Sequence, residues 1–203
     1  MSTIASDQAA PDSKPLLLTG AAGWLGRHLR PHLAKRKGGL RSSDILEFGP
    51  ALPGEEIVLA DLGDAAAVDR MVDGVSGIVH FGGIRIEDSF DAILRANIVG
   101  TYNVIDAARR KGVKRVVYAS SVHAIGYYPS SQTIDSTVVH RPDGYYGVSK
   151  AFAEDLARLY VDKAGMDIAC LRIGTVLQEP LALRVMRGSA FVPGTRVRPA
   201  MPS

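Results

Sequence analysis

Three glycines, Gly20, Gly23 and Gly26, stand between an apolar run at residues 16–19 and a helical pattern at residues 24–36. A buried strand that leads into a helix through such a turn is typical of dinucleotide-binding units. The first glycine permits the turn, the second lets the backbone approach a pyrophosphate, and the third lets the helix pack on the strand. The helix N-terminus then presents free amides to the diphosphate. The triplet therefore predicts a nucleotide site, with a plain glycine-rich turn as the alternative.

The rest of the chain alternates between apolar runs and helical patterns, with no internal repeat. We expect strands at 40–44, 56–61, 77–80, 115–121 and 167–174, and helices at 65–72, at 88–110 and from 145 through Tyr160. This alternation predicts an α/β fold with a doubly wound parallel sheet. Residues 127–144 show neither period, and a loop of that length in a compact domain usually serves a site.

Composition places the chain in one class and excludes others. Its 203 residues are 46% hydrophobic, which suits one sizeable domain. The net charge of +3 comes from interspersed residues, so we expect neither a nucleic-acid nor a membrane partner. Cys170 is the only cysteine, which excludes an internal disulfide and fits a cytoplasmic protein. One cysteine and five scattered histidines also predict no metal site.

An acidic residue near the end of the second expected strand indicates which cofactor is bound. Asp44 lies 24 residues past Gly20, where a carboxylate can accept hydrogen bonds from the adenosine ribose. A carboxylate there repels a 2′-phosphate, so Asp44 favours NAD over NADP, although Arg41 weakens this inference. Glu47 is the rival ribose ligand, and Asp44 could instead cap a turn.

Further cofactor contacts are expected at the carboxyl ends of the strands, where ligands collect in open parallel sheets. Asp61 and Leu62 end the third strand, where they could touch an adenine ring, although a polar strand end explains Asp61 almost as well. Gly82 follows the fourth strand and suits a backbone close to a ligand, with a simple turn as the alternative. We also assign Trp24 and Leu25, at the start of the first helix, to the cofactor site.

A tyrosine and a lysine open the helix at residue 145, within the string YYGVSK. Tyr146 and Lys150 are four residues apart and so share one helix face. A fixed ammonium favours the phenolate, so Lys150 is expected to make Tyr146 a usable base. Ser121 ends the fifth strand at the same sheet edge and can converge with them. The alternative is a surface helix that carries this pair by chance.

Three motifs in order, GAAGWLG, ASS and YGVSK, resemble the extended short-chain dehydrogenase/reductase superfamily. The longer strings GIVHFGGI, NIVGTYNV, HAIGYYP and RPDGYYGVSKAFAEDLARLY look closest to the uronate dehydrogenases. The likeness implies a Rossmann-like fold and the oxidation of a hexuronic acid, such as glucuronate or galacturonate, at C1 by NAD to give an aldarolactone. A nucleotide-sugar epimerase or dehydratase, or a catalytically weak NAD-binding protein, stays open as an alternative.

The resemblance assigns roles to individual residues. It places the catalytic triad of the family on Ser121, Tyr146 and Lys150, with Tyr146 taking the proton from the anomeric hydroxyl and Ser121 holding the same oxygen. Lys150 would bind the nicotinamide ribose and keep Tyr146 acidic. It also implies that His123 contacts the substrate and that Arg184 binds its carboxylate.

Two departures from the family pattern concern the sugar preference. The usual SSNH reads SSVH here, so Val122 lacks an amide that would contact sugar hydroxyls. Arg85 stands where a small hydroxyl residue is more typical.

The sequence divides into three parts: residues 1–14 as a disordered tail, 15–184 as the NAD-binding domain with the catalytic helix, and 185–203 as an irregular tail. The resemblance stops after Arg184, whereas family members continue with a substrate lobe. We therefore expect a truncated chain whose last residues are read in a shifted frame, with a genuine short variant as the alternative. The sequence leaves open whether the chain forms a homo-oligomer.

Overall fold

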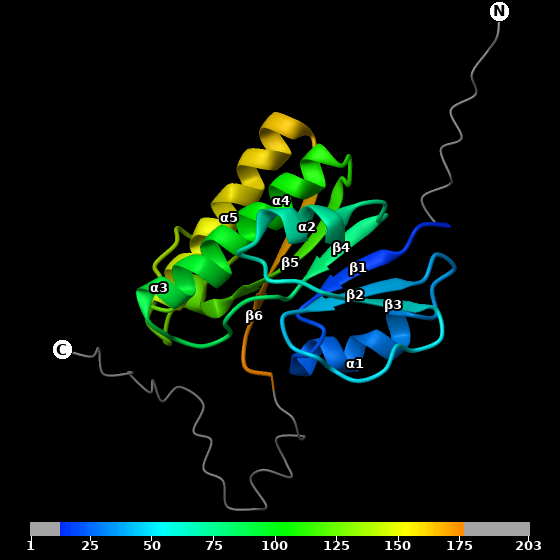
Figure 1. Cartoon of the computed structure of the whole chain (residues 1–203). Coiled ribbons are helices and arrows are strands. Elements are labelled where there is room, and N and C mark those ends of the chain that lie inside the picture. Colours follow the sequence, from blue (N-terminus) through cyan, green and yellow to red (C-terminus); the bar gives the residue numbers. More distant parts are fainter. Residues whose placement is uncertain (1–12, 177–203) are drawn as a thin grey trace, which may run out of the picture.

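The computed structural model describes residues 13–176, whose strands form one parallel sheet in the order β3-β2-β1-β4-β5-β6 (Figure 1). The strands are β1 Leu16–Thr19, β2 Leu40–Asp44, β3 Glu55–Leu59, β4 Gly77–His80, β5 Arg115–Ser121 and β6 Asp167–Ile173. The strand order reverses between β1 and β4, which makes the carboxyl ends of these two strands the expected ligand crevice. The predicted doubly wound sheet is confirmed.

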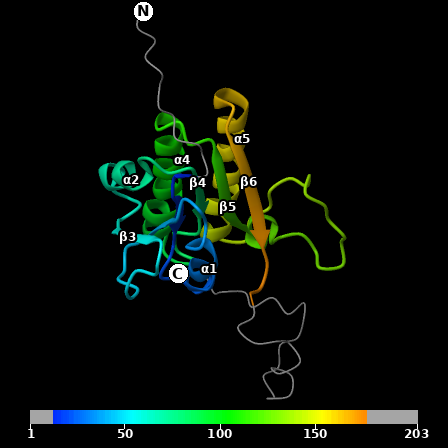
Figure 2. The ribbon, with the colours of Figure 1, turned by 90° about the vertical axis from the view of Figure 1, so that its right-hand side faces the viewer.

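Helices cover both faces of this sheet. They are α1 Trp24–Leu33, α2 Ala65–Val72, α3 Phe90–Ile93, a π-helical segment η2 Leu94–Val99, α4 Gly100–Arg110, a 3-10 turn η3 Val122–Ile125 and α5 Tyr145–Ala164. Helix α1 lies on one face, and α2, α4 and α5 lie on the other (Figures 1 and 2). Among residues 13–176, no helix combines the length and apolar character needed to cross a membrane.

The alternation of side chains along β1 explains the two-layered core. Leu17 and Leu18 are both fully buried, yet they belong to different clusters because successive strand residues point to opposite faces. Leu17 packs with residues of α2 and α4, including Met71 and Ile105. Leu18 packs on the side of α1, with Ala34. Burial on both faces is what a central parallel strand requires.

The expected helix at 88–110 is interrupted. Six residues at its centre, Leu94–Val99, adopt π-helical geometry, a form that appears mostly as local bulges and often near functional sites. Asn97 lies in this segment and is 1% exposed. Its side-chain oxygen accepts from the Ile84 amide at 2.7 Å, and its nitrogen donates to the Ser149 hydroxyl at 3.1 Å. Asn97 therefore has a structural role, in which it joins the loop after β4 to α5.

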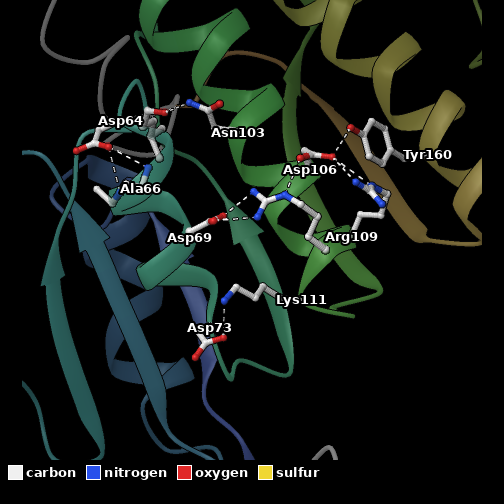
Figure 3. Close-up of polar contacts among 12 residues, drawn as sticks. Asp64, Ala66, Asp69, Asp73, Asn103, Asp106, Arg109, Lys111 and Tyr160 are labelled. Atoms are coloured by element: carbon white, nitrogen blue, oxygen red, sulfur yellow. Dashed lines mark hydrogen bonds and ion pairs between the residues drawn. The ribbon is translucent and has the colours of Figure 1, made fainter.

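Polar contacts link α2, α4 and α5: Asp69 is joined to Asp106 through an arginine, and Tyr160 contacts Asp106 (Figure 3). Arg110 on α4 pairs with Asp69 on α2 at 2.6 Å and with Asp106 at 2.8 Å. The Tyr160 hydroxyl on α5 donates to Asp106 at 3.0 Å. A shared network of this kind holds helices better than isolated surface pairs do. It therefore helps to fix α5, the helix that carries Tyr146.

A buried ion pair fixes the segment that follows β2. Arg30 on α1 donates through two nitrogens to the two carboxylate oxygens of Glu55 on β3, each at 2.7 Å. Their side chains are 8% and 0% exposed. The same guanidinium donates to the carbonyl oxygens of Phe48 and Pro50, and the Leu52 amide donates to Glu55 at 2.8 Å. The pair thus anchors the chain just beyond Asp44.

Candidate active site

Backbone atoms pack so closely around the glycine turn that two of its positions have no room for a Cβ atom. Gly20 has φ of +73°, and a Cβ there would lie 2.6 Å from the carbonyl carbon of Phe81 and 2.7 Å from the Gly82 nitrogen. A Cβ on Gly26 would overlap the carbonyl oxygen of Gly20. Glycine is therefore required at both positions, the first for its backbone conformation and the second for the close approach of α1 to the turn.

The start of α1 has the features that a diphosphate requires. Gly23 is the N-cap residue, no side chain caps the helix there, and its first turn contains no acidic residue. The positive end of the helix dipole is thus left for an anion. Trp24 is exposed and Leu25 half-buried at this end. These features fit the pyrophosphate of a dinucleotide, as the sequence predicted.

Asp44 ends β2 beside the glycine turn. One of its carboxylate oxygens accepts from the Ala22 amide at 2.9 Å, and the other accepts from the Leu46 amide at 3.2 Å. The carboxylate therefore lies at the edge of the turn, where the ribose ligand was expected, and also helps to hold the turn in place. Glu47, the rival ribose ligand, is exposed.

Asp61 and Leu62 lie at the same end of the sheet. Asp61 accepts from Arg95 at 2.6 Å and from the Gly63 amide at 2.8 Å. The hydrogen bond from Arg95, followed by that from Gly63, holds the pKa of this carboxyl below its ordinary value. A Cβ on Gly82 would lie 2.7 Å from Leu62, so Leu62 packs against the Gly82 backbone. The contact of Asp61 with adenine stays a prediction.

The structure brings Ser121, Tyr146 and Lys150 together. Ser121 is the last residue of β5, while Tyr146 and Lys150 occupy the first turns of α5. Tyr146 interacts with the Ser121 hydroxyl through a hydrogen bond, and the Lys150 Nζ lies 5.3 Å from the Tyr146 ring centroid. Ser121 is 5% and Lys150 is 6% exposed, whereas Tyr146 is half-buried. The predicted convergence of these three side chains is confirmed.

The electrostatics of this cluster differ from the expectation. Burial raises the pKa of Tyr146 above its ordinary value, and the hydrogen bond with Ser121 acts in the opposite direction. Burial lowers the pKa of Lys150 to about 8. The expected net lowering of the Tyr146 pKa is wrong in direction, because burial dominates. The Lys150 ammonium donates instead to the Tyr118 hydroxyl at 3.1 Å and to the Ala119 carbonyl oxygen at 2.9 Å.

His123 adjoins the cluster. Its ring packs edge-on against Tyr146 with centroids 5.6 Å apart, and its Nδ1 lies 3.0 Å from both carboxylate oxygens of Asp143. Asp143 thereby orients the imidazole and leaves Nε2 facing away from the carboxylate. Asp143 is not among the predicted site residues, although its position just before the YYGVSK helix is a usable sequence signal.

The N-terminus of α5 is capped from a distant part of the chain. Gly144 at the N-cap position contributes no side-chain bond. Glu87, from the loop after β4, accepts from the amides of Tyr145 at 2.7 Å and Tyr146 at 3.0 Å. A carboxylate at a helix N-terminus is favoured by the unpaired amides and the helix dipole. No local pattern could have identified Glu87, because 58 residues separate it from Tyr145.

The remaining expectations have mixed outcomes. Arg184 and the proposed tail at 185–203 lie outside the described residues, as do residues 1–12 of the N-terminal tail. Val122 is 42% exposed and Arg85 is also exposed, so both departures from the family pattern lie at the surface of the protein. Within residues 13–176, no group of three or more His, Cys, Asp or Glu side chains could hold a metal.

The strand order, the glycine turn and the Ser121, Tyr146 and Lys150 cluster define a Rossmann-like dinucleotide-binding protein with the side chains of a short-chain dehydrogenase/reductase. The chain belongs to the NAD dependent epimerase/dehydratase family, whose model matches residues 16–180.

Similar proteins narrow this class. Uronate dehydrogenases from Pseudomonas syringae pv. tomato and Agrobacterium fabrum are 49% and 51% identical, over 84% and 85% of this chain. The crystal structure of uronate dehydrogenase from Agrobacterium tumefaciens superposes with a TM-score of 0.79 at 53% identity, covering 82% of this chain and 63% of that one. This chain spans less than two thirds of the two curated relatives, 62% and 65% of their lengths.

Proposed function

We infer that this protein is an NAD-dependent uronate dehydrogenase that oxidises a hexuronic acid at C1 to an aldarolactone. The observation that carries this proposal is the convergence of Ser121, Tyr146 and Lys150 at the same end of the sheet as a glycine turn that fits a dinucleotide. The similarity to uronate dehydrogenases, at about half of the aligned positions, supports the substrate class.

In this proposal Tyr146 takes the proton from the C1 hydroxyl of the sugar, while Ser121 donates a hydrogen bond to the same oxygen. NAD supplies the acceptor for the hydride that leaves C1, so the C1–O single bond becomes the lactone carbonyl. Only the phenolate of Tyr146 can accept the proton. Since burial raises its pKa, the rate is expected to increase with pH on the acid side of the profile.

Substrate recognition is assigned to residues around Tyr146. The Nε2 atom of His123, turned away from Asp143, is free of that carboxylate and suits a sugar hydroxyl. Arg184 would bind the sugar carboxylate with its planar guanidinium. Val122 and Arg85, which differ from the family pattern, would alter the preference between glucuronate and galacturonate.

The function is tested by measuring NADH formation by the 203-residue chain with glucuronate, galacturonate and glucose, alongside calorimetric titration with NAD. Turnover of a uronate but not of glucose is expected, because glucose lacks the carboxylate. NAD binding without turnover of either uronate would overturn the dehydrogenase proposal and support a catalytically weak NAD-binding protein. Conversion of a nucleotide sugar without net NADH would support the epimerase or dehydratase alternative.

Cofactor choice gives a separate prediction. The variant Asp44→Asn keeps an oxygen for the Ala22 amide but removes the charge, and a hydrogen bond to a charged group contributes about 1.5–3 kcal/mol. We expect NAD affinity to fall by about 10-fold or more, and the preference over NADP to shrink, when both cofactors are titrated by calorimetry.

The matched control is Glu47→Gln, which removes an exposed carboxylate on the same segment and is expected to leave NAD affinity unchanged. A loss of affinity in Glu47→Gln with no loss in Asp44→Asn would instead identify Glu47 as the ribose ligand.

A further inference from the structure

A continuous line of polar side chains crosses the interior of the sheet and ends at Lys150. It begins at the Gly82 amide, which donates to the Thr19 hydroxyl at 3.0 Å. Thr19 lies 2.6 Å from Nδ1 of His80, and Nε2 of His80 lies 3.4 Å from the Thr101 hydroxyl. Thr19, His80 and Thr101 are each at most 1% exposed. The line thus links the Gly82 backbone, which lies against the glycine turn at Gly20, to the interior of the protein.

Tyr118 completes this line. Its hydroxyl is hydrogen-bonded to Thr101 and receives a hydrogen bond from the Lys150 ammonium at 3.1 Å. The side chain is 1% exposed and its ring packs against His80 with centroids 5.5 Å apart. Lys150 also lies 4.8 Å from the centroid of the Tyr118 ring, a cation–π distance. The phenol therefore contacts the lysine with both its oxygen and its ring face.

The protonation states of the line favour a fixed direction of hydrogen bonds. Burial, and then the charge of Lys150, lower the pKa of His80 to about 3, so its imidazole is neutral. Because the Gly82 amide already donates to Thr19, the Thr19 hydroxyl can donate to Nδ1, and Nε2–H then donates to Thr101. Burial also raises the pKa of Tyr118, so it stays a neutral phenol.

A phenylalanine would fill the same space at position 118 and keep the ring contacts with His80 and Lys150. Packing alone therefore does not require the hydroxyl. The free-energy cost of burying the Tyr118 hydroxyl is offset because the hydroxyl is hydrogen-bonded to both Thr101 and Lys150. In turn, Tyr118 supplies one of the two oxygens within residues 13–176 that accept from the buried ammonium, the other being the Ala119 carbonyl. An ammonium in an apolar interior depends strongly on such acceptors.

We propose that Tyr118 is a positioning residue of the active site, whose hydroxyl, bonded to Thr101 and through it linked to His80, keeps the Lys150 ammonium protonated and in place beside Tyr146. This role deepens the proposed function, on which its kinetic consequence rests. Lys150 lies one helical turn from Tyr146, so a displaced or neutral amine would no longer favour the phenolate.

The titratable groups that act on this cluster come from four elements. His80 lies on β4, Tyr146 and Glu154 on α5, and Cys170 on β6, in addition to Tyr118 on β5. The imidazole of His80 is neutral, and the carboxylate of Glu154 forms an ion pair with the guanidinium of Arg172.

The test follows Lys150 directly, by NMR titration of the full chain labelled with ¹³C at the lysine ε position. Lys150→Met identifies the Lys150 signal. In Tyr118→Phe the midpoint of the Lys150 titration is expected to fall by about one pH unit, because the ammonium loses one acceptor. The matched control is Tyr160→Phe, which removes a hydroxyl that bonds to Asp106 and leaves Lys150 untouched.

Kinetics provide the second readout. In the pH profile of kcat/KM with a uronate, the alkaline limb is expected to move to lower pH in Tyr118→Phe and to stay in place in Tyr160→Phe. An unchanged Lys150 midpoint in Tyr118→Phe would overturn the proposal. If Tyr118→Phe does not fold, the Lys150 titration is repeated in Thr101→Val, which removes the hydrogen bond between Thr101 and the Tyr118 hydroxyl. The same shift of the Lys150 midpoint is then the expected result. Absence of uronate turnover in the wild type would overturn the proposed function only, since the NMR titration needs no substrate.

Discussion

The variant Tyr146→Phe is expected to lower kcat for uronate oxidation by about 10²–10⁴-fold, the usual contribution of a general base. The phenylalanine ring keeps the edge-on contact with His123 and the position over Lys150, so folding and NAD binding are expected to persist. The measurement is NADH formation at saturating NAD and uronate, with NAD affinity measured separately by calorimetry. A loss confined to kcat is the signature of a group needed in the transition state.

The neighbouring residue offers a matched control. Tyr145 is 42% exposed and packs edge-on against Phe90 with centroids 5.4 Å apart. Tyr145→Phe is expected to leave kcat unchanged. Equal activity in Tyr146→Phe and the wild type would show that another group accepts the proton, with His123 as the nearest imidazole.

The variant Arg30→Met is expected to lower the free energy of unfolding by about 3–5 kcal/mol, because it leaves the carboxylate of Glu55 buried without its partner. That loss is a large part of the roughly 5–15 kcal/mol that stabilises a typical domain. The measurement is equilibrium unfolding in urea near neutral pH. Arg158→Met is the control: Arg158 is 71% exposed and pairs with Asp155 at only 3.7 Å, so a change below about 1 kcal/mol is expected.

The pH dependence of stability provides a further check on the same pair. Burial raises the pKa of Glu55, but the hydrogen bonds from Arg30, Ser42 and Leu52 together lower it below the ordinary value. Its contribution to stability is therefore present above the unfolded-state pKa and is lost as the pH falls through the folded-state pKa. Arg30→Met should weaken this acid dependence. A variant as stable as the wild type would mean that the pair contributes nothing.

Local patterns were sufficient for the fold. The apolar runs and glycine positions predicted all six strands because buried parallel strands have a strong local signature. The ends of elements were less accurate: the first helix stops at Leu33 and not at Arg36, since the chain turns there toward β2. The π-helical segment at Leu94–Val99 was not predicted, because it forms through tertiary bonds such as those of Asn97.

The site was predicted where its residues lie at element ends and missed where they act across the fold. Ser121, Tyr146 and Lys150 follow from strand and helix positions. The role of Tyr118 was not predicted, because a tyrosine in an apolar strand has the pattern of a core residue and its contact with Lys150 spans 32 positions. The direction of the Tyr146 pKa depends on burial and on where the lysine head points, neither of which is visible in spacing.

The cap on α5 has a consequence for how the active site forms. Its first turn depends on Glu87, so a peptide that contained only this helix would fray at the end that carries Tyr146. The position of Tyr146 therefore depends on the contact of α5 with the segment beyond β4. We therefore expect local unfolding of the segment beyond β4 to displace Tyr146 before the rest of α5 is lost.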